Sequence, residues 1–600
     1  MSGGQSIRQL VTRWADQTPE SPAIRSLHGP PMTYAILADI MDSGARAVRG
    51  TGVAVNDRVA IVLPNGPMMA TAFLCATTAA TAAPMNPNLT EDEFSYYFAD
   101  LNVSLVVASE DDTTGAAFVA ERMGIPVLRV AEDKNGPAGA FTFDPAEGAP
   151  APIIPDPEDV ALVLHTSGTT ARPKIVPLTQ RNLTKSAANV ARTLQLSPAD
   201  SCLGVMPLFH IHGLVAALLA SLHAGASVVC TPGFSAVSFL EWIATHQPTW
   251  YTAVPTMHQA VLARTRTHSP PLGTLRLIRS SSAALPPSVL QELESKFATP
   301  VIEAYGMTEA AHQIASNPLP PLARKPGSVG TAAGPEVSIV DEAGSHLDVG
   351  AIGEVVIRGS NVTHGYHGAV DSSEHFVDHH WFRTGDQGFL DDDGYLSLTG
   401  RLKEIINRGG ETIAPREIDE VMLDIEGVRQ AVAFAVPDIV LGEEVAAVVI
   451  LDDGATLSEA EIQAEVSDHL SFSKVPKRIV FASEIPKGPT GKLQRVGLAA
   501  KLGVTSVRSG FSGGGDLTSP TGEVVAALWR EVLEIDDVGL DEPFLESGGD
   551  SIAATALAAR VEEEFAIDLP LLAFYNAATI RLQTNLIDEL TSGTERPPAP

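Results

Sequence analysis

The 600-residue sequence contains few cysteines, far fewer basic than acidic residues, and no unbroken hydrophobic run of membrane-spanning length. Its three cysteines, Cys75, Cys202 and Cys230, lack metal-binding or disulfide-framework spacing, so we predict buried thiols in a reducing compartment, the cytoplasm. A formal net charge of -32 disfavours nucleic acid and anionic membranes as partners, because their phosphates would be repelled at long range. A small basic pocket could still bind a nucleotide.

Two segments near the start of the chain carry apolar residues of the kind found in membrane spans or signal peptides. The most apolar stretch, residues 68–85, is interrupted by four threonines and Pro84, which predicts a buried helix rather than a membrane span. Apolar side chains between residues 7 and 14 recur at helical spacing without a charged start followed by an apolar run, which predicts a helix and no signal peptide.

The pattern of strands and helices changes along the chain. From residue 55 to about 305, β-rich runs such as RVAIVL and TWYTAV alternate with longer helical segments, as in parallel sheets with crossover helices. Residues 336–400 predict a small antiparallel β region. The chain from there to about residue 500 predicts a compact α+β domain. Residues 506–520 are rich in glycine and serine and predict a flexible tether, and residues 521–592 predict an acidic helical bundle.

The segment LHTSGTTARPK follows a predicted strand directly and has the composition of a phosphate-binding loop. Ser167, Thr169 and Thr170 offer hydroxyl donors, Gly168 permits a tight turn, and Lys174 adds positive charge. It is no Walker A loop, because no Gly-Lys-Ser/Thr follows at the required spacing. Taken alone, the segment could also be an ordinary polar surface loop.

Further segments supply groups suited to a nucleotide. EAYGMTEAAH joins Tyr305, which can stack on a purine, to Thr308 and Glu309, an alcohol and a carboxylate suited to phosphate and Mg²⁺. WFRTGD ends in Asp386, whose two oxygens could accept hydrogen bonds from ribose. PKGPTGKLQR presents Lys492 from a turn-rich loop. Each of these segments, taken singly, could be structural.

The combination and order of these motifs are more specific than any one of them. From residue 5 to about 500, LHTSGTTARPK, EAYGMTEA, WFRTGD, GRLKEIINRGG and GPTGKLQR resemble the adenylate-forming superfamily, which includes acyl-CoA synthetases, nonribosomal-peptide adenylation domains and firefly luciferase. The resemblance implies that a carboxylic acid attacks the α-phosphate of ATP, that pyrophosphate leaves, and that a thiol then takes the acyl group. A mobile C-terminal subdomain would rotate between these two half-reactions.

The resemblance also implies a role for each matching residue. The predicted nucleotide-binding residues are Thr166, Ser167, Gly168, Thr169, Thr170 and Lys174 for the phosphates, Ala283, Ala284 and Tyr305 for adenine, and Asp386 and Arg401 for ribose. The predicted catalytic residues are Lys492, His210, Thr308 and Glu309, with Glu309 also the Mg²⁺ ligand, Lys403 the hinge, and Gly409 and Gly410 the lining of the thiol channel. A packing role for His210 stays open, and its neighbour His212 is predicted to be structural.

Two positions depart from the family pattern. Ala171 and Ile175 stand where glycine is usual, which restricts the loop conformations available there without removing a catalytic group.

The segment SGGDSIAATAL stands at the start of a predicted amphipathic helix behind the tether. Ser551 would lie exposed at a positive helix end, where an attached phosphodiester is favoured, although a simple N-cap would give the same isolated pattern. PFLESGGDSIAATAL resembles the carrier-protein motif whose serine carries 4'-phosphopantetheine. The resemblance makes the thiol acceptor part of the same chain, with a phosphopantetheinyl transferase and a downstream acyl-accepting enzyme as expected partners.

These observations together predict the fold class and the domain limits. The expected fold is α/β, with a large N-terminal domain of parallel α/β layers plus a small β region, a small α+β subdomain and a helical-bundle carrier domain. The predicted limits are 1–402 for the N-terminal core domain, 403–500 for the mobile subdomain, 501–520 for the linker, 521–592 for the carrier domain and 593–600 for a disordered tail.

The acid is less well defined by the sequence. The Asp that pairs with an amino-acid ammonium group in relatives has no counterpart here, so a small non-amino acid is expected. LHTSGTTARPKIVPLTQRNL, EAAHQIASNPLP and NVTHGY look most like the oxalate-CoA ligase branch. That likeness places Ser280, Ser281, Met307 and His312 in the acid pocket. Arg279 could add charge there or be structural.

The sequence is therefore consistent with three functions. The first is activation of a small acid and its transfer, as a thioester, to the phosphopantetheine arm on Ser551 for a natural-product-type assembly line. The second is an oxalate-CoA-like ligase that uses free CoA and has a vestigial or regulatory carrier domain. The third is a catalytically silent docking protein, which the presence of Lys492, Glu309, Asp386 and Arg401 disfavours.

Overall fold

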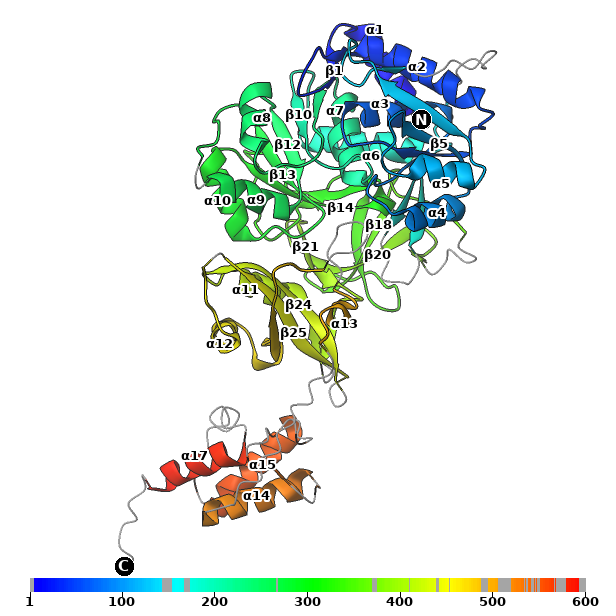
Figure 1. Ribbon diagram of the computed structural model, residues 1–600. Coiled ribbons are helices and arrows are strands. Elements are labelled where there is room, and N and C mark those ends of the chain that lie inside the picture. The colour runs from blue at the N-terminus through cyan, green and yellow to red at the C-terminus, as the bar shows by residue number, and fades with distance from the viewer. Residues whose placement is uncertain are drawn as a thin grey trace, which may run out of the picture. The chain divides into compact units, whose positions relative to one another are not determined.

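Figure 1 shows the computed structural model of the chain. The chain divides into two compact units. The first unit comprises residues 1–406, 412–435 and 445–498, and the second comprises residues 407–411, 436–444 and 499–600. The structure describes residues 5–142, 154–166, 173–265, 268–368, 375–408, 411–438, 442–452, 454–486, 495–504, 519–533, 535, 538–540, 544, 547, 551–565, 567 and 579–592.

A seven-stranded, mostly parallel sheet forms one layer of the first unit, in the order β7-β6-β5-β3-β4-β8-β9. Only its two edge strands, β7 and β9, pair antiparallel. Its strands are β3 (Arg58–Val62), β4 (Thr81–Pro84), β5 (Val103–Ser109), β6 (Val127–Glu132), β7 (Phe141–Thr142), β8 (Val160–Thr166) and β9 (Lys174–Thr179).

A nine-stranded sheet forms the second layer, in the order β16-β15-β14-β13-β12-β10-β11-β1-β2, and its six central strands from β14 to β1 pair in parallel. Its strands are β1 (Pro22–Arg25), β2 (Met32–Thr33), β10 (Ser201–Gly204), β11 (Ser227–Cys230), β12 (Trp250–Ala253), β13 (Leu277–Ser280), β14 (Val301–Met307), β15 (His312–Ser316) and β16 (Thr331–Ala332). The predicted alternation of parallel strands and helices is confirmed.

Helices fill the space around both sheets, and several begin where the sequence supplies a cap. Ser6, Thr90 and Thr179 each accept a hydrogen bond from the backbone three residues on, in reciprocal capping boxes. The helices of this region are α1 (Ile7–Gln17), α2 (Tyr34–Gly50), α3 (Pro67–Ala79), α4 (Glu91–Asp100), α5 (Ala116–Arg122), α6 (Gln180–Thr193), the π-helix η1 (His212–Leu219), α7 (Ala220–His223), α8 (Phe239–His246), α9 (Pro255–Thr265), α10 (Pro287–Phe297) and the short 3-10 turn η2 (Thr308–Ala310).

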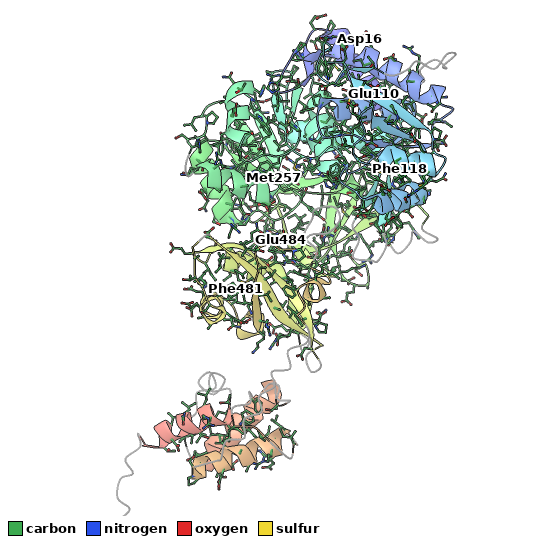
Figure 2. The ribbon with its side chains drawn as sticks, in the orientation of Figure 1. Asp16, Glu110, Phe118, Met257, Phe481 and Glu484 are labelled. Atoms are coloured by element: carbon green, nitrogen blue, oxygen red, sulfur yellow. The ribbon has the colours of Figure 1, made fainter. Side chains whose placement is uncertain are left out.

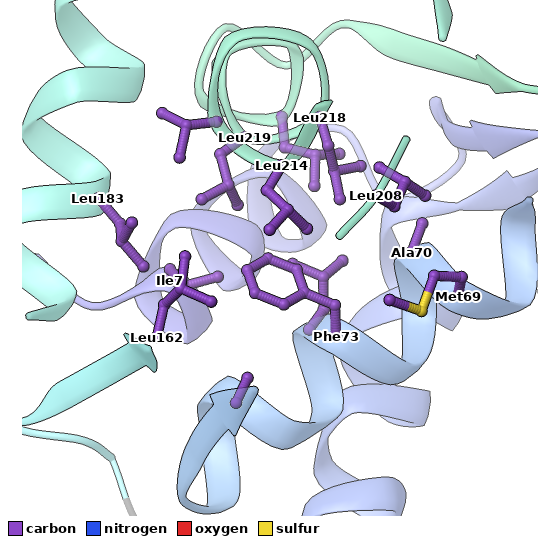
Figure 3. Packing of buried hydrophobic residues seen from close by; sticks show 14 of the residues in the cluster. Ile7, Met69, Ala70, Phe73, Leu162, Leu183, Leu208, Leu214, Leu218 and Leu219 are labelled. Carbon is purple, nitrogen blue, oxygen red and sulfur yellow. The ribbon is translucent and has the colours of Figure 1, made fainter. Parts of the chain in front are cut away.

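The largest core lies between the two sheets. Phe73 of α3 packs against Leu214 and Leu218 of η1, with Leu162 of β8 and Leu183 of α6 close by (Figure 3). Helices α8, α9 and α10 cover the other face of the nine-stranded sheet (Figure 1). The core therefore holds the two sheets together and fixes the loops that follow their strands.

The expectation of one helix over residues 68–85 is only partly right. Helix α3 ends at Ala79, and residues 81–84 form β4, which lies between β3 and β8 and is buried. A strand covered on both faces is as uniformly apolar as a buried helix, so the hydrophobic pattern cannot separate them. All three cysteines are unpaired and buried, as predicted.

A smaller antiparallel sheet follows, as the sequence predicts, in the order β17-β18-β20-β19 with β21 beside β20. Its strands are β17 (Glu336–Val340), β18 (Gly353–Arg358), β19 (Phe376–Val377), β20 (Trp381–Leu390) and β21 (Leu396–Arg401). It places Asp386 of β20 directly opposite Arg401 of β21.

The chain after Arg401 forms the expected mixed α+β structure. Within the first unit, β26 pairs in parallel with β25, and Ile413, Ile418 and Ile462 contribute to a shared core. The elements are β22 (Ile406–Arg408), β23 (Glu411–Ile413), α11 (Pro415–Leu423), β24 (Val428–Asp438), β25 (Gly442–Leu451), α12 (Glu459–His469), the short 3-10 turn η4 (Phe472–Lys474), β26 (Arg478–Phe481) and α13 (Leu498–Lys501).

The last part of the second unit is the predicted helical bundle of α14 (Pro520–Leu533), α15 (Ser551–Phe565) and α17 (Ile580–Ser592). Trp529 of α14, Leu557 and Val561 of α15, and Ile587 of α17 form its core. The indole nitrogen of Trp529 donates to Gln583 at 2.8 Å, which satisfies the one polar atom of that buried ring.

Acidic side chains such as Asp16 and Glu110 lie exposed on the surface (Figure 2). None of the helices in the described part of the chain combines the length and the apolar character that crossing a bilayer requires.

Candidate active site

The hairpin from β14 to β15 positions the TEA segment. If Gly306 carried a Cβ, that atom would lie 1.8 Å from the carbonyl oxygen of His312, so only glycine fits there. The return turn passes through Ala311 and His312, both with positive φ (47° and 95°). Such strained backbone is found where the surrounding fold holds functional groups in place. The hairpin thereby sets Tyr305, Thr308 and Glu309 beyond the carboxyl ends of the parallel strands, where α/β sheets bind ligands.

Tyr305, Asp386 and Arg401 form one contact group, with Asp386 at its centre. The phenol of Tyr305 donates to Oδ2 of Asp386, and Nε of Arg401 lies 3.0 Å from Oδ1. Asp386 is only 5% exposed, whereas half of the Arg401 side chain is exposed. The Asp386 carboxylate raises the pKa of Arg401, with Glu404, Tyr305 and Glu309 contributing. The fold therefore brings Tyr305, one of the predicted purine residues, together with the predicted ribose residues Asp386 and Arg401.

A second contact group joins Glu309 to Lys174 through a residue that the sequence analysis did not single out, Tyr366. Its hydroxyl donates to Oε1 of Glu309 at 2.7 Å, and the ammonium of Lys174 lies 4.3 Å from its ring centroid. Burial and the neighbouring Glu309 raise the pKa of Tyr366, so the phenol stays protonated and donates. The one signal was the segment NVTHGY, which carried the family resemblance and no stated role.

The buried carboxylate of Glu309 fits the predicted Mg²⁺. Among the residues that the structure describes, no three His, Cys, Asp or Glu side chains are grouped to hold a metal. Mg²⁺ beside a nucleotide is usually held by one or two carboxylates, phosphate oxygens and waters. Glu309, 6% exposed and oriented by Tyr366, is a donor of that kind.

The predicted acid-pocket residues lie at the ends of β13, β14 and β15. Ser280, Ser281 and His312 have no exposed surface, and Met307 and His210 are half-buried. His210 lies against the ring of Phe209, with 4.6 Å between the ring centroids.

His212, predicted to be structural, is nearly fully buried. Its Nε2 lies 2.6 Å from Oγ1 of Thr252 and its Nδ1 3.0 Å from Oγ of Ser282. Its ring stacks on His312, with 4.8 Å between the centroids. His212 therefore links β12, the loop after β13 and the TEA hairpin.

The remaining predicted residues differ in how far the structure describes them. Thr166 ends β8, Lys174 begins β9, Ala283 and Lys403 are exposed, and Ala284 is half-buried. Ser551 is the first residue of the 15-residue helix α15, as predicted. The residues that lie outside the described part of the chain are the predicted residues Ser167, Gly168, Thr169, Thr170, Gly409, Gly410 and Lys492, the position Ala171, residues 506–518 of the predicted tether 506–520, and the tail 593–600.

Known proteins resemble this chain in both sequence and fold. The AMP-binding enzyme family matches residues 11–367, the C-terminal domain of AMP-binding enzymes matches 417–492, and the phosphopantetheine attachment site matches 523–587. The chain is 42% identical over 499 residues to an oxalate–CoA ligase of Arabidopsis thaliana. The matched region covers 82% of this chain and 97% of the relative. A sulfoacetate–CoA ligase of Cupriavidus necator is 38% identical over 501 residues, with the same coverage of both chains.

Among solved structures, the ATP-bound MatB of Rhodopseudomonas palustris superposes with a TM-score of 0.75 and 31% identity, covering 83% of this chain and 99% of that one. The resemblance to adenylate-forming enzymes followed by a carrier domain is thus confirmed. The chain belongs to the AMP-binding enzyme family as an acyl-adenylate-forming acid–thiol ligase, and it also contains a phosphopantetheine attachment domain.

Proposed function

We propose that this enzyme activates a small non-amino carboxylic acid as its acyl adenylate and transfers the acyl group, as a thioester, to the phosphopantetheine arm on Ser551 of its own carrier domain. The observation that carries the first half is the contact group around Asp386, joined electrostatically through Arg401 to Glu309. The phosphopantetheine attachment domain in the same chain supports the second half. The domain limits predicted above, with the hinge at Lys403, are part of this proposal.

In the first half-reaction, a carboxylate oxygen of the acid attacks the α-phosphorus of ATP. The bond from that phosphorus to the bridging oxygen breaks, and pyrophosphate leaves with the bonding electron pair. Tyr305, Ala283 and Ala284 would contact adenine, and Asp386 and Arg401 would hold the ribose. Lys492 would stabilise the charge that develops on the phosphate, which for one such donor is worth about 3 kcal/mol.

The phosphate-binding groups act together in this step. Thr166, Lys174 and the loop between them would bind the triphosphate, and Thr308 would donate to it. Glu309 would hold Mg²⁺, which neutralises phosphate charge, while Tyr366 keeps the Glu309 carboxylate oriented. His210 would stand beside the reacting carboxylate.

The second half-reaction needs a thiol. The N-terminus of a long helix favours a phosphodiester, so Ser551 at the start of α15 fits the attachment of 4'-phosphopantetheine by a transferase. That group would supply the sulfur that takes the acyl group as a thioester, with AMP as the leaving group. A tether in the same chain keeps the sulfur at high effective concentration, which favours loading in cis. A downstream biosynthetic enzyme would then accept the acyl group.

The acid is proposed to be oxalate or a similarly short acid. Both ligase relatives described above are named for short acids with a second acidic group. The buried serines Ser280 and Ser281 and the buried His312 suit a small polar substrate.

A second candidate is an acyl-CoA ligase that uses free CoA, with a carrier domain that is vestigial or regulatory. The names of the relatives, which are CoA ligases, favour it. It shares the first half-reaction and differs only in the thiol.

ATP–pyrophosphate exchange across oxalate, other short diacids, hydroxy acids, aryl acids and fatty acids tests the proposal. We expect exchange with at least one short acid, a drop of about 100-fold or more in Lys492→Ala, and normal exchange in the control Lys474→Ala. Lys474 pairs with Glu417 at 2.7 Å in the same part of the chain. Absence of exchange with every acid would overturn the proposal and favour a silent docking protein.

A further inference from the structure

Arg279, near the end of β13, is a fully buried cation with no anionic partner among the residues that the structure describes. Its side chain is 0% exposed. Nη1 donates to the hydroxyl of Thr252 at 3.3 Å and Nη2 to the amide oxygen of Gln313 at 3.2 Å, and both partners are neutral. The buried Nε has no hydrogen-bond partner, and the described residues include no ion pair with Arg279.

Such an arrangement is unfavourable unless something else compensates it. Burying a charge away from water destabilises a protein strongly unless an opposite charge and hydrogen bonds compensate it. Burial lowers the pKa of Arg279 to about 9, so the guanidinium still carries its charge at neutral pH. Arg495, by contrast, keeps 15% of its side chain exposed and pairs with the carboxylates of Asp419 and Glu404. Arg279 has no such partner among the described residues, and its buried charge calls for an anion.

The position of Arg279 connects it to the acid pocket. Thr252 and Arg279 are register partners, each one residue before the carboxyl end of its parallel strand. This is the sheet edge at which ligands of parallel α/β folds bind. Thr252 also contacts Nε2 of His212, whose ring stacks on His312. The same face of β13 carries Leu277, which packs in the core between the two sheets.

We propose that Arg279, with Thr252 and Gln313, binds the second anionic group of a short acid, a carboxylate or a sulfonate. This inference rests on the proposed adenylation and adds the substrate class, a short acid with two anionic ends. The planar guanidinium has five N–H donors, and a carboxylate or sulfonate can accept two of them at once. One carboxylate of the acid would be activated while Arg279 holds the second anionic group. A monoanionic acid of equal length lacks that second group and would therefore be excluded as a substrate. Arg279 is then a specificity-determining residue.

The test compares each diacid with the acid in which one carboxylate is replaced by a hydroxymethyl group. The pairs are oxalate with glycolate, malonate with 3-hydroxypropionate, and succinate with 4-hydroxybutyrate, and the readout is kcat/KM for ATP–pyrophosphate exchange. The variants are Arg279→Met, which keeps an unbranched chain without charge, and Arg279→Lys, which keeps the charge without the fork. Arg276→Met is the matched control, since Arg276 lies just before the same strand and pairs with Asp200 at 3.0 Å.

We expect the wild type to prefer the diacid of at least one pair. Arg279→Met should lower the ratio of kcat/KM for the diacid to kcat/KM for the hydroxy acid about 30-fold or more. The fall should come mainly from a lower kcat/KM for the diacid, since a charged hydrogen bond is lost. Arg279→Lys should lower the ratio about 5-fold, and Arg276→Met should leave it unchanged. Should Arg279→Met fail to fold by circular dichroism, the ratio in Arg279→Lys decides.

Two results would overturn the inference while leaving the proposed function intact. One is a wild type that exchanges with both members of every pair equally well. The other is a variant at Arg279 that folds and loses both members of each pair to the same extent, as a purely structural cation predicts. Absence of exchange with all acids, in contrast, contradicts the proposed function itself.

Discussion

Replacement of Tyr366 by phenylalanine tests how the protein orients its predicted metal-binding carboxylate. The change removes the hydroxyl that donates to Oε1 of Glu309 at 2.7 Å and keeps the ring over the ammonium of Lys174. A hydrogen bond to a charged group is worth about 1.5–3 kcal/mol. Since about 1.4 kcal/mol corresponds to a factor of ten in rate, we expect kcat/KM for MgATP to fall about 10- to 100-fold.

The protein offers a matched control for this change. Tyr395 also places its ring beneath a lysine, with 4.4 Å between its centroid and the ammonium of Lys325, and its hydroxyl donates to the carbonyl of Ala323. It belongs to neither contact group of the candidate site. Tyr395→Phe should reduce thermal stability to an extent similar to Tyr366→Phe and leave ATP–pyrophosphate exchange within about twofold of the wild type.

The assay is steady-state ATP–pyrophosphate exchange with the best acid, with Mg²⁺ and ATP varied separately. Tyr366→Leu, which also removes the cation–π contact, should lose about another threefold, because such contacts are worth about 0.5–1 kcal/mol at partly exposed sites. A Tyr366→Phe enzyme with wild-type kcat/KM, or one no more affected than Tyr395→Phe, would refute the orienting role.

Three further predictions concern Asp386, Glu303 and Ser551. Asp386→Asn should raise the KM for ATP about tenfold or more, because the buried carboxylate that contacts Tyr305 and Arg401 loses its charge. The control is Glu336→Gln, which removes one charge of an exposed ion pair and should behave as wild type. Burial raises the pKa of Glu303 from 4.5 to about 7, so the folded state retains a proton that the unfolded state releases. The free energy of unfolding should therefore fall as pH rises from about 4.5 to about 7, by at most about 1.4 kcal/mol per pH unit. In Glu303→Gln the melting temperature should fall less over this pH range. Parallel plots of melting temperature against pH for the two proteins would contradict this. Ser551→Ala should keep pyrophosphate exchange unchanged and abolish acyl loading of the chain, as seen by intact mass.

Much of the fold follows from local pattern. The β-rich runs RVAIVL and TWYTAV became β3 and β12, and the apolar spacing of the C-terminal segment became the bundle of α14, α15 and α17. The run over residues 68–85 was harder, because α3 and β4 are both buried on all sides and show no period. That the parallel strands form two sheets rather than one depends on long-range pairing, which local pattern does not encode.

The candidate site was predicted unevenly for a similar reason. Motifs named Tyr305, Glu309 and Asp386, since each is a polar residue in a recognisable segment, and the fold brings them together. Tyr366 was missed because its importance comes from contacts with Glu309 and Lys174, which are distant in the sequence. Arg279 stayed ambiguous because only the structure shows that its buried guanidinium faces neutral partners.

The most direct test of the account is whether a single chain both activates the acid and receives it. Pantetheinylated protein is given ATP, Mg²⁺ and its best acid, and the acyl mass on the peptide containing Ser551 is measured. The wild type is compared with an equimolar mixture of Lys492→Ala and Ser551→Ala. The account predicts rapid acylation in the wild type and slow, concentration-dependent acylation in the mixture. Pyrophosphate release with no acyl mass on Ser551, while free CoA is acylated, would contradict it.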